Sequence, residues 1–111
     1  VHIDSEVTSK LPPDRTAYVT AKAAQVGLMR AAALEYASAG ITVNAVAPGF
    51  IPVERHANLD DHELETYRST IPAGAIGTPA DVAAAVAFLA SAGAGFITGQ
   101  RIVVDGGRHL T

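Results

Sequence analysis

Two side chains near the start of the sequence have the types and the spacing that proton transfer to an oxygen atom requires. Tyr18 and Lys22 are four positions apart, so on a helix both side chains project from the same face. Tyrosine has an ordinary pKa of about 10, too high for efficient proton transfer at neutral pH, and a nearby ammonium lowers it by favouring the phenolate. The pair therefore indicates a general acid or base, although the same spacing also occurs in ordinary surface helices.

The elements that must position this pair follow from the pattern of helix-forming and β-branched residues. Residues 17–39 are rich in alanine and leucine and are followed by Gly40, which predicts a long helix closed by a glycine. Short apolar runs at residues 1–3, 41–46 and 101–104 predict strands. The long helix leads directly into the second strand, as in half of a βαβ unit.

Two more helices are expected in the second half of the chain. Acidic residues in the first turn favour a short helix over residues 60–68. The sequence Thr-Pro-Ala-Asp at residues 78–81 is typical of a helix start with a capping box. Residues 82–92 continue this helix with apolar side chains nearly all round, so we expect it to be buried on more than one side. Residues 7–16, which contain two consecutive prolines, predict a polar loop.

The alternation of strands and helices predicts the α/β class with a parallel sheet. Such a sheet needs cover on both faces, which three strands and two main helices cannot provide alone. We therefore expect a missing half or a partner chain to complete the structure. The chain begins with Val1 rather than methionine, in what resembles a strand already under way, so we expect a fragment or a processed piece.

Composition narrows the functional classes. The 111 residues suffice for one domain, and 8 basic against 11 acidic residues give a net charge of −3, which argues against nucleic acid as a partner. No apolar run reaches the ~18 residues of a membrane helix. The absence of cysteine excludes disulfides, a thiol nucleophile and cysteine-ligated zinc, and it suits a reducing compartment.

Further residues of interest stand where the expected strands end. Ser5 follows the first strand, 13 positions before Tyr18, and Pro48 and Gly49 follow the second strand. Ligands of parallel sheets bind at the carboxyl ends of the strands. We therefore expect these residues and the start of the long helix to meet at one edge of the sheet.

Together these features strongly resemble the short-chain dehydrogenase/reductase family. The matching residues are Ser5 and residues 18–24, 41–49, 77–83, 98–100 and 104–107, in the family's order and spacing. The resemblance implies a three-layer, Rossmann-like parallel sheet of which residues 1–111 form the C-terminal part. The family's glycine-rich turn for the dinucleotide pyrophosphate has no counterpart in the sequence, nor has the residue that separates NAD from NADP.

The resemblance implies catalytic roles for three residues. Tyr18 is expected to donate a proton to the alkoxide formed as hydride reaches a carbonyl, or to accept it in the reverse direction. Lys22 is expected to lower the pKa of Tyr18 and to bind the nicotinamide ribose, and Ser5 to hydrogen-bond the substrate oxygen. These roles imply an oxidoreductase that interconverts a secondary alcohol and a ketone with NAD or NADP.

The resemblance also implies cofactor contacts in the loop after the second strand. Pro48 and Gly49 are expected to shape it against the nicotinamide ring, and the Ile51 backbone to meet the carboxamide. Val53 stands where the family often has a threonine, so the hydroxyl contact at this cofactor-binding position is lost. Residues 54–70 are expected to form a lid over a small alcohol or carbonyl substrate. Apolar residues in this region favour a partly apolar pocket, or equally core packing: Phe50, Leu59, Leu64, Tyr67 and Ile71.

Two functional hypotheses remain open. The first is the C-terminal half of a cytoplasmic enzyme that works as a homodimer or homotetramer. The second is a non-catalytic assembly module that uses its alanine-rich helix and its last helix and strand for subunit contacts. On either hypothesis, we expect the isolated chain not to bind a dinucleotide tightly.

Other polar residues have ordinary structural interpretations. The four histidines lack the spacing of metal ligands: His2, His56, His62 and His109. An acidic cluster is expected at a solvated helix start: Asp60, Asp61, Glu63 and Glu65. Residues 105–107 are expected to form a strand-terminating turn. We expect Arg15 to face solvent and Asn44 to hydrogen-bond a neighbouring loop.

Overall fold

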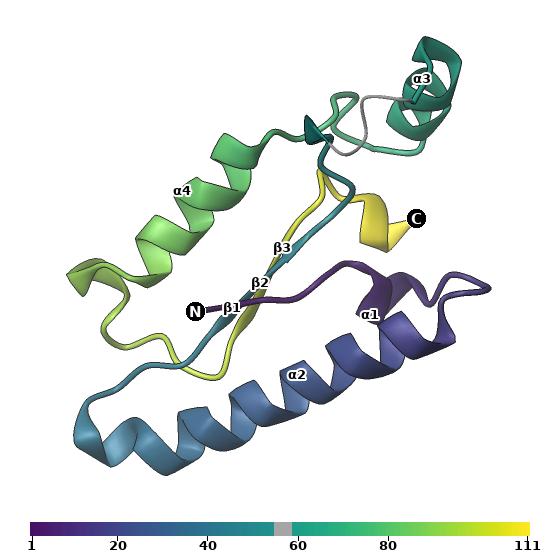
Figure 1. Cartoon of the computed structure of the whole chain (residues 1–111). Coiled ribbons are helices and arrows are strands. Elements are labelled where there is room, and N and C mark those ends of the chain that lie inside the picture. Colours follow the sequence, from purple (N-terminus) through teal and green to yellow (C-terminus); the bar gives the residue numbers. More distant parts are fainter. Residues whose placement is uncertain (55–58) are drawn as a thin grey trace.

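The computed structural model describes residues 1–54 and 59–111, which fold around a parallel sheet. The strands are β1 (His2–Ile3), β2 (Ala45–Pro48) and β3 (Arg101–Val104), side by side in that order (Figure 1). Both strand pairs are parallel, with His2 and Arg101 opposite Ala45. The expected α/β class with a parallel sheet is confirmed.

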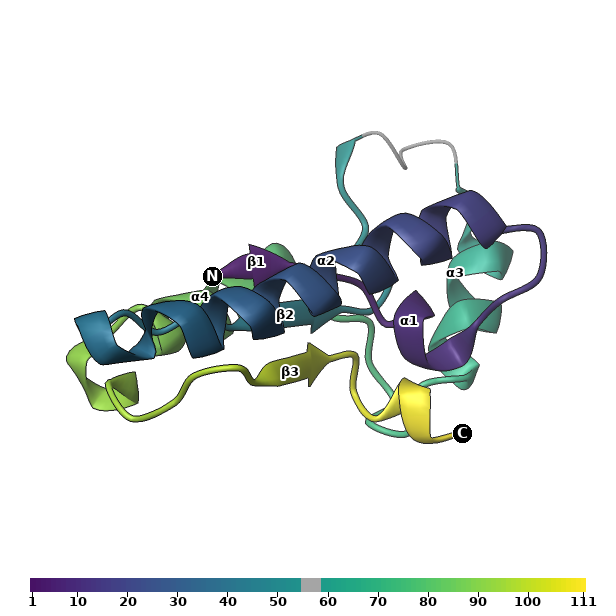
Figure 2. The same ribbon diagram turned by 90° about the horizontal axis from the view of Figure 1, so that it is seen from below.

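The long helix α2 (Thr16–Tyr36) forms as predicted. It continues into the short helix η1 (Ala37–Ala39) and ends at Gly40, whose φ of 74° is the left-handed conformation that favours glycine. Met29 and Ala33 are its buried residues. Helices α2 and α4 (Pro79–Leu89) lie on opposite sides of the sheet (Figures 1 and 2).

Helix α4 starts at the predicted capping box but is less buried than its sequence indicates. Asp81 accepts hydrogen bonds from the Thr78 backbone N–H and hydroxyl, both at 2.7 Å. Within the helix only Leu89 is buried, and Phe88 is 49% exposed. The expectation of burial on more than one side is wrong for this chain, because only one face of the helix has the sheet to pack against.

The second strand lies later in the sequence than predicted. Residues 41–44 are outside β2, and their polar groups bond a loop instead. The buried Asn44 donates to the Ile97 carbonyl at 2.7 Å and accepts from the Gln100 N–H at 2.9 Å. The structural role expected for Asn44 is confirmed, and these side-chain bonds explain why a regular strand begins only at Ala45.

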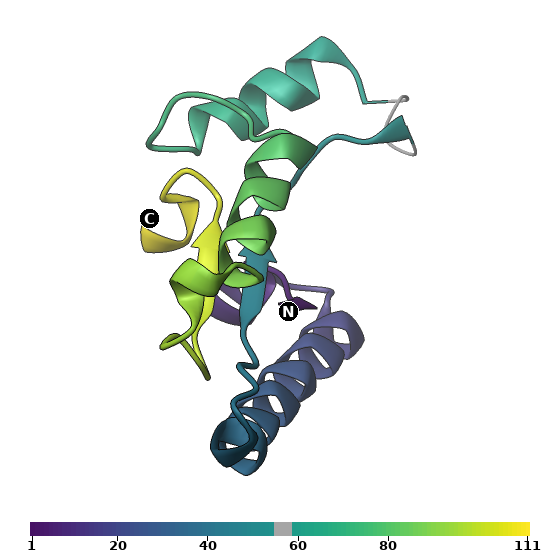
Figure 3. The same cartoon turned by 90° about the vertical axis from the view of Figure 1, so that its left-hand side faces the viewer.

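Short helices gather beyond the carboxyl ends of the strands (Figure 1). The expected loop after β1 contains a helical turn, α1 (Val7–Lys10), which ends at Leu11 with a left-handed φ of 48°. Helix α3 (Asp61–Ser69) forms within the predicted region and lies on the side of the sheet away from α2 (Figures 1 and 3). Two 3-10 turns, η3 (Ala92–Ala94) and η4 (Arg108–Leu110), flank β3 in the sequence.

The core consists of small and medium apolar side chains on β2, together with residues from the two main helices. Ala45, Val46 and Ala47 are almost completely buried, as expected from a composition poor in aromatic residues. No helix in the described part of the chain is long and apolar enough to cross a membrane.

Candidate functional site

Tyr18 and Lys22 lie together at the start of α2. The Nζ atom of Lys22 is 5.9 Å from the centroid of the Tyr18 ring, in agreement with their four-residue spacing. The same Nζ donates to the Ile3 carbonyl at 2.8 Å and to the Gln25 side-chain oxygen at 3.4 Å. The ammonium therefore lies between the phenol ring and the carboxyl end of β1.

Ser5 is held at that same strand end. The ladder between the first two strands continues past β1, because Asp4 donates its N–H to Val46 at 2.7 Å and Glu6 donates to Pro48 at 2.9 Å. Between them Ser5 is half-buried, and its hydroxyl oxygen accepts from the Val7 N–H at 3.4 Å. Ser5 therefore belongs to the turn between β1 and α1. Tyr18 and Lys22 belong to α2, which is connected to the end of β1 by the hydrogen bond from Lys22 to Ile3.

The loop after β2 is shaped by a close approach between backbones. Gly49 donates its N–H to the Val104 carbonyl at 3.0 Å, and a Cβ atom on Gly49 would lie 2.9 Å from the Cβ of Asp105. Glycine is therefore required where the ends of β2 and β3 meet. Further along the loop, the Ile51 side chain fills the space beside Gly77, and Val53 is 38% exposed.

Helix α3 contacts this loop through Tyr67. The Tyr67 hydroxyl oxygen accepts from the Phe50 N–H at 2.8 Å, and the two rings pack edge to face with centroids 5.1 Å apart. Ile71 is buried beside Gly106, so its apolar side chain serves the core. Part of the expected lid, residues 55–58, lies outside the described residues.

A cleft of about 300 Å³ opens between this loop, α3 and the end of β3. Its walls include Phe50, Ile51, Tyr67 and Val104. Ser5, Tyr18 and Lys22 do not line it, because they belong to the β1 side of the sheet whereas the cleft is on the β3 side. Of the two residues expected beside the end of β1, Pro48 accepts from the Glu6 N–H, whereas Gly49 bonds the end of β3.

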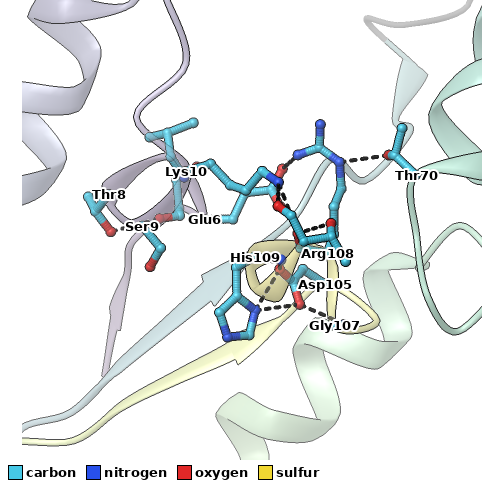
Figure 4. A network of polar contacts seen from close by, with 12 residues as sticks. Glu6, Thr8, Ser9, Lys10, Thr70, Asp105, Gly107, Arg108 and His109 are labelled. Atoms are coloured by element: carbon cyan, nitrogen blue, oxygen red, sulfur yellow. Dashed lines mark hydrogen bonds and ion pairs between the residues drawn. The ribbon is translucent and has the colours of Figure 1, made fainter.

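A cluster of charged and polar side chains forms around Glu6, the residue after Ser5 (Figure 4). Glu6 is buried and pairs with Arg108 at 2.6 Å, while Arg108 also donates to the Thr70 hydroxyl and lies over the Tyr67 ring. Burial raises the pKa of Glu6, and the Arg108 charge opposes that rise only in part. Burial likewise raises the pKa of Tyr67. Sequence reasoning missed this cluster, because Glu6 and Arg108 are 102 positions apart.

The turn after β3 has the expected structural role. Gly106 and Gly107 have left-handed φ values of 64° and 87°, and Gly107 donates its N–H to the Asp105 carboxylate. Burial opposes ionisation of Asp105, but hydrogen bonds from His109 and Gly107 and the nearby imidazole outweigh it and lower its pKa. The Lys10 ammonium donates hydrogen bonds to the backbone carbonyls of Arg108 and Thr111, which follow this turn.

The remaining polar candidates occupy ordinary positions. Asp60 and Glu63 form a reciprocal capping box, and Arg15 is exposed. His109 contacts Asp105, whereas His56 lies outside the described residues. Among residues 1–54 and 59–111, histidine and acidic side chains form no group of three or more that could hold a metal ion.

Comparison with known proteins shows which family the chain belongs to. A family model described as enoyl-(acyl carrier protein) reductase matches residues 1–109. The chain is also similar to curated 3-oxoacyl-(acyl-carrier-protein) reductases named FabG. It is 46% identical to that of Haemophilus influenzae over 111 residues, 44% to that of Staphylococcus aureus over 110 and 40% to that of Vibrio harveyi over 110.

These alignments cover 100%, 99% and 99% of the chain but 46%, 45% and 45% of the respective relatives. The chain thus spans about half the length of the curated relatives it matches. The relatives are reductases by name, and the family model matches nearly the whole chain. The chain belongs to the short-chain dehydrogenase/reductase family.

Proposed function

We propose that residues 1–111 form the C-terminal part of a single-domain, NAD(P)-dependent oxidoreductase that interconverts a secondary alcohol and a ketone. The observation that carries this proposal is the position of the Lys22 ammonium, between the Tyr18 ring and the Ile3 carbonyl. This position brings a phenol and a cation to the strand end from which Ser5 follows. Such a set suits proton transfer to an oxygen atom.

Tyr18 is the proton donor in this proposal, and Lys22 and Ser5 assist it. The Lys22 ammonium stabilises the phenolate that remains when Tyr18 gives its proton to the alkoxide. The Ser5 hydroxyl donates a hydrogen bond to the same substrate oxygen and stabilises the charge that develops on it. In the direction of alcohol oxidation, the Tyr18 phenolate accepts the proton instead.

The chain's own residues fit a nicotinamide nucleotide at this edge of the sheet. A lysine ammonium has three donors, of which Ile3 and Gln25 take two, so a third can serve a ribose hydroxyl. Pro48 and Gly49 hold the loop that would face the nicotinamide ring, and the Ile51 backbone and Val53 continue that surface. The bound nucleotide, NAD or NADP, supplies or accepts the hydride.

The names of the relatives suggest the substrate. They are reductases of 3-oxoacyl groups on acyl carrier protein, so we propose a 3-oxoacyl thioester as the carbonyl substrate. Its 3-oxo group takes up one hydride and one proton and becomes a secondary alcohol. We further propose a cytoplasmic homodimer or homotetramer.

Substitution of Tyr18 tests the proposal in the full-length polypeptide that contains this chain. Tyr18→Phe removes the proton donor and keeps the ring, so turnover should fall by about 10²–10⁴-fold. NADPH affinity, followed by the fluorescence of the reduced cofactor, should stay nearly unchanged. Tyr36→Phe is the matched control, because Tyr36 belongs to the same helix and is 45% exposed against 46% for Tyr18. Full activity of the Tyr18→Phe variant would contradict the proposed mechanism.

The second candidate function is a non-catalytic assembly module. Large apolar side chains are exposed on the two main helices and near β3, with Leu34 at 84% and Phe96 at 105%. Apolar surface of this kind favours contacts with other chains. In a titration of the 111-residue chain with NADH and NADPH we expect no tight binding on either proposal, and tight binding of one of these nucleotides would rule out the assembly module.

A further inference from the structure

Arg101 reaches across the sheet to the turn that carries Ser5. Its guanidinium contacts the Asp4 carboxylate through Nε at 2.5 Å and the Ser5 carbonyl through Nη2 at 2.8 Å. It also bonds the hydroxyls of Thr8 at 2.6 Å and Ser9 at 3.1 Å. One side chain from β3 therefore bonds the residue before Ser5, the carbonyl of Ser5 itself and two hydroxyls of helix α1.

The register of the strands explains how Arg101 spans this distance. Arg101 and His2 both lie opposite Ala45, so their side chains share one face of the sheet. Crossing β2 takes the guanidinium about 9–10 Å, which is two strand spacings. The small side chain of Ala45 leaves the face open for this crossing.

The ion pair between Arg101 and Asp4 is largely shielded from water. The Asp4 side chain is fully buried and that of Arg101 is 14% exposed. Thr8 adds a hydrogen bond to the same Asp4 oxygen at 3.0 Å, while Oδ1 of Asp4 has no partner among the described residues. Arg101 therefore supplies the positive charge that a buried carboxylate needs.

We propose that Arg101 is a positioning residue that holds Ser5 in place for catalysis. The inference rests on the proposed function, in which the Ser5 hydroxyl bonds the reacting oxygen. The backbone N–H groups of Asp4 and Glu6 are fixed by β2, and the Ser5 carbonyl accepts its shortest bond, at 2.8 Å, from Arg101, beside bonds from the Thr8 hydroxyl and N–H at 3.0 and 3.3 Å. With these groups held, the backbone of Ser5 has little freedom, so its Cα–Cβ bond keeps one direction towards the substrate oxygen proposed above.

Arg101→Lys is the first test, in the full-length polypeptide with a 3-oxoacyl thioester and NADPH. Lysine keeps a positive charge beside Asp4 but lacks the rigid set of donors that joins Asp4, Ser5 and Ser9. We expect kcat to fall by about 100-fold, because small displacements of a catalytic group have effects of that size. NADPH affinity should stay unchanged. Arg30→Lys is the matched control, because Arg30 is exposed on α2 and belongs to no part of the proposed site.

A double substitution separates positioning from a merely structural role. If Arg101 acts through Ser5, Arg101→Lys should add little to the loss caused by Ser5→Ala. An equal fall of kcat in both backgrounds would overturn the proposal, and so would unchanged kcat in the single Arg101→Lys variant. If Arg101→Lys does not fold, Ser9→Ala replaces it, because the Ser9 hydroxyl bonds Arg101 at 3.1 Å. A fall of kcat in Ser9→Ala supports the role of Arg101, and unchanged kcat overturns it.

The two proposals fail in different ways. Full activity of Tyr18→Phe or Ser5→Ala would refute the proposed function. Loss of activity in those variants, together with full activity of Arg101→Lys, would refute only the role of Arg101.

Discussion

The side-chain ammonium of Lys22 is bonded to the backbone carbonyl of Ile3 at 2.8 Å. This bond joins the second turn of α2 to the last residue of β1, and it connects two elements that are separated by α1 and a proline-containing loop. Lys22 therefore has a structural partner as well as a neighbouring phenol. Its position fixes the distance between the helix that carries Tyr18 and the strand that leads to Ser5.

Substitution of Lys22 should affect both turnover and cofactor binding. Lys22→Gln removes the charge beside Tyr18 and the donor proposed for the ribose, so we expect turnover to fall by at least about 100-fold. NADPH should also bind more weakly, unlike in Tyr18→Phe. Arg30→Gln, an exposed charge change on the same helix, serves as the control. Unchanged NADPH affinity in Lys22→Gln would remove the proposed ribose contact.

Two glycines should respond in opposite ways to alanine. Gly49→Ala places a Cβ atom 2.9 Å from the Cβ of Asp105 and 3.3 Å from its Cα, so we expect a loss of about 1–3 kcal/mol in the free energy of unfolding. Gly27 lies inside α2 with nothing within 4 Å of its Cβ position. Gly27→Ala should therefore stabilise the protein by about 0.5–1 kcal/mol. Urea denaturation measures both changes, and equal effects of the two substitutions would contradict the close approach at Gly49.

Loss of Arg108 should destabilise the protein in a pH-dependent way. Arg108→Met leaves the buried Glu6 carboxylate unpaired, which costs about 3 kcal/mol at pH 7. Burial raises the pKa of Glu6 above its ordinary 4.5, so the folded state favours the neutral acid. The penalty should therefore shrink as the pH falls from 7 through the raised pKa of Glu6 and the carboxylate takes up a proton. A penalty that stays constant over this range in denaturation experiments would show that Glu6 charge is not its cause.

The same reasoning predicts that Glu6→Gln is tolerated better than Arg108→Met. Glutamine keeps the shape of Glu6 without a buried charge, and the Arg108 side chain is 22% exposed, so its charge can be solvated. The double variant should be more stable than Arg108→Met alone. If the two single losses simply add, the two side chains are not coupled.

At the start of α4, the contribution of Asp81 to stability should be lost as the pH falls. Hydrogen bonds from the Thr78 N–H and hydroxyl lower the pKa of Asp81 below its ordinary 3.8. The stability that ionised Asp81 contributes is present above pH 3.8 and is lost as the pH falls through the lower folded-state pKa. The difference in melting temperature between wild type and Asp81→Asn should therefore narrow below pH 3.8. A difference that is the same at pH 5 and pH 2.5 would contradict this assignment.

Local signals in the sequence predicted much of the architecture. Gly40 marked the end of α2, residues 78–81 marked the start of α4, and the four-residue spacing of Tyr18 and Lys22 brought them together. Each of these features depends on neighbours within one or two helical turns. Such short-range patterns determine structure with little influence from the rest of the chain.

Long-range side-chain bonds account for what the sequence did not predict. The strand expected at residues 41–46 begins only at Ala45, since Asn44 bonds the distant loop that holds Ile97 and Gln100. The bonds from Arg101 to Asp4 and Ser5 depend on strand register and on the small size of Ala45, which no local pattern encodes. Apolar residues on α4 indicated burial, but the extent of burial depends on what packs against the helix.

The reach of Arg101 across the sheet also bears on the order in which the chain becomes structured. Arg101 and Asp4 are 97 positions apart, and closing so long a loop is entropically unfavourable until other contacts are in place. During synthesis from the N-terminus, the segment around Ser5 is made long before the strand that carries Arg101. We therefore expect Ser5 to acquire its final geometry late in folding, when β3 docks beside β2.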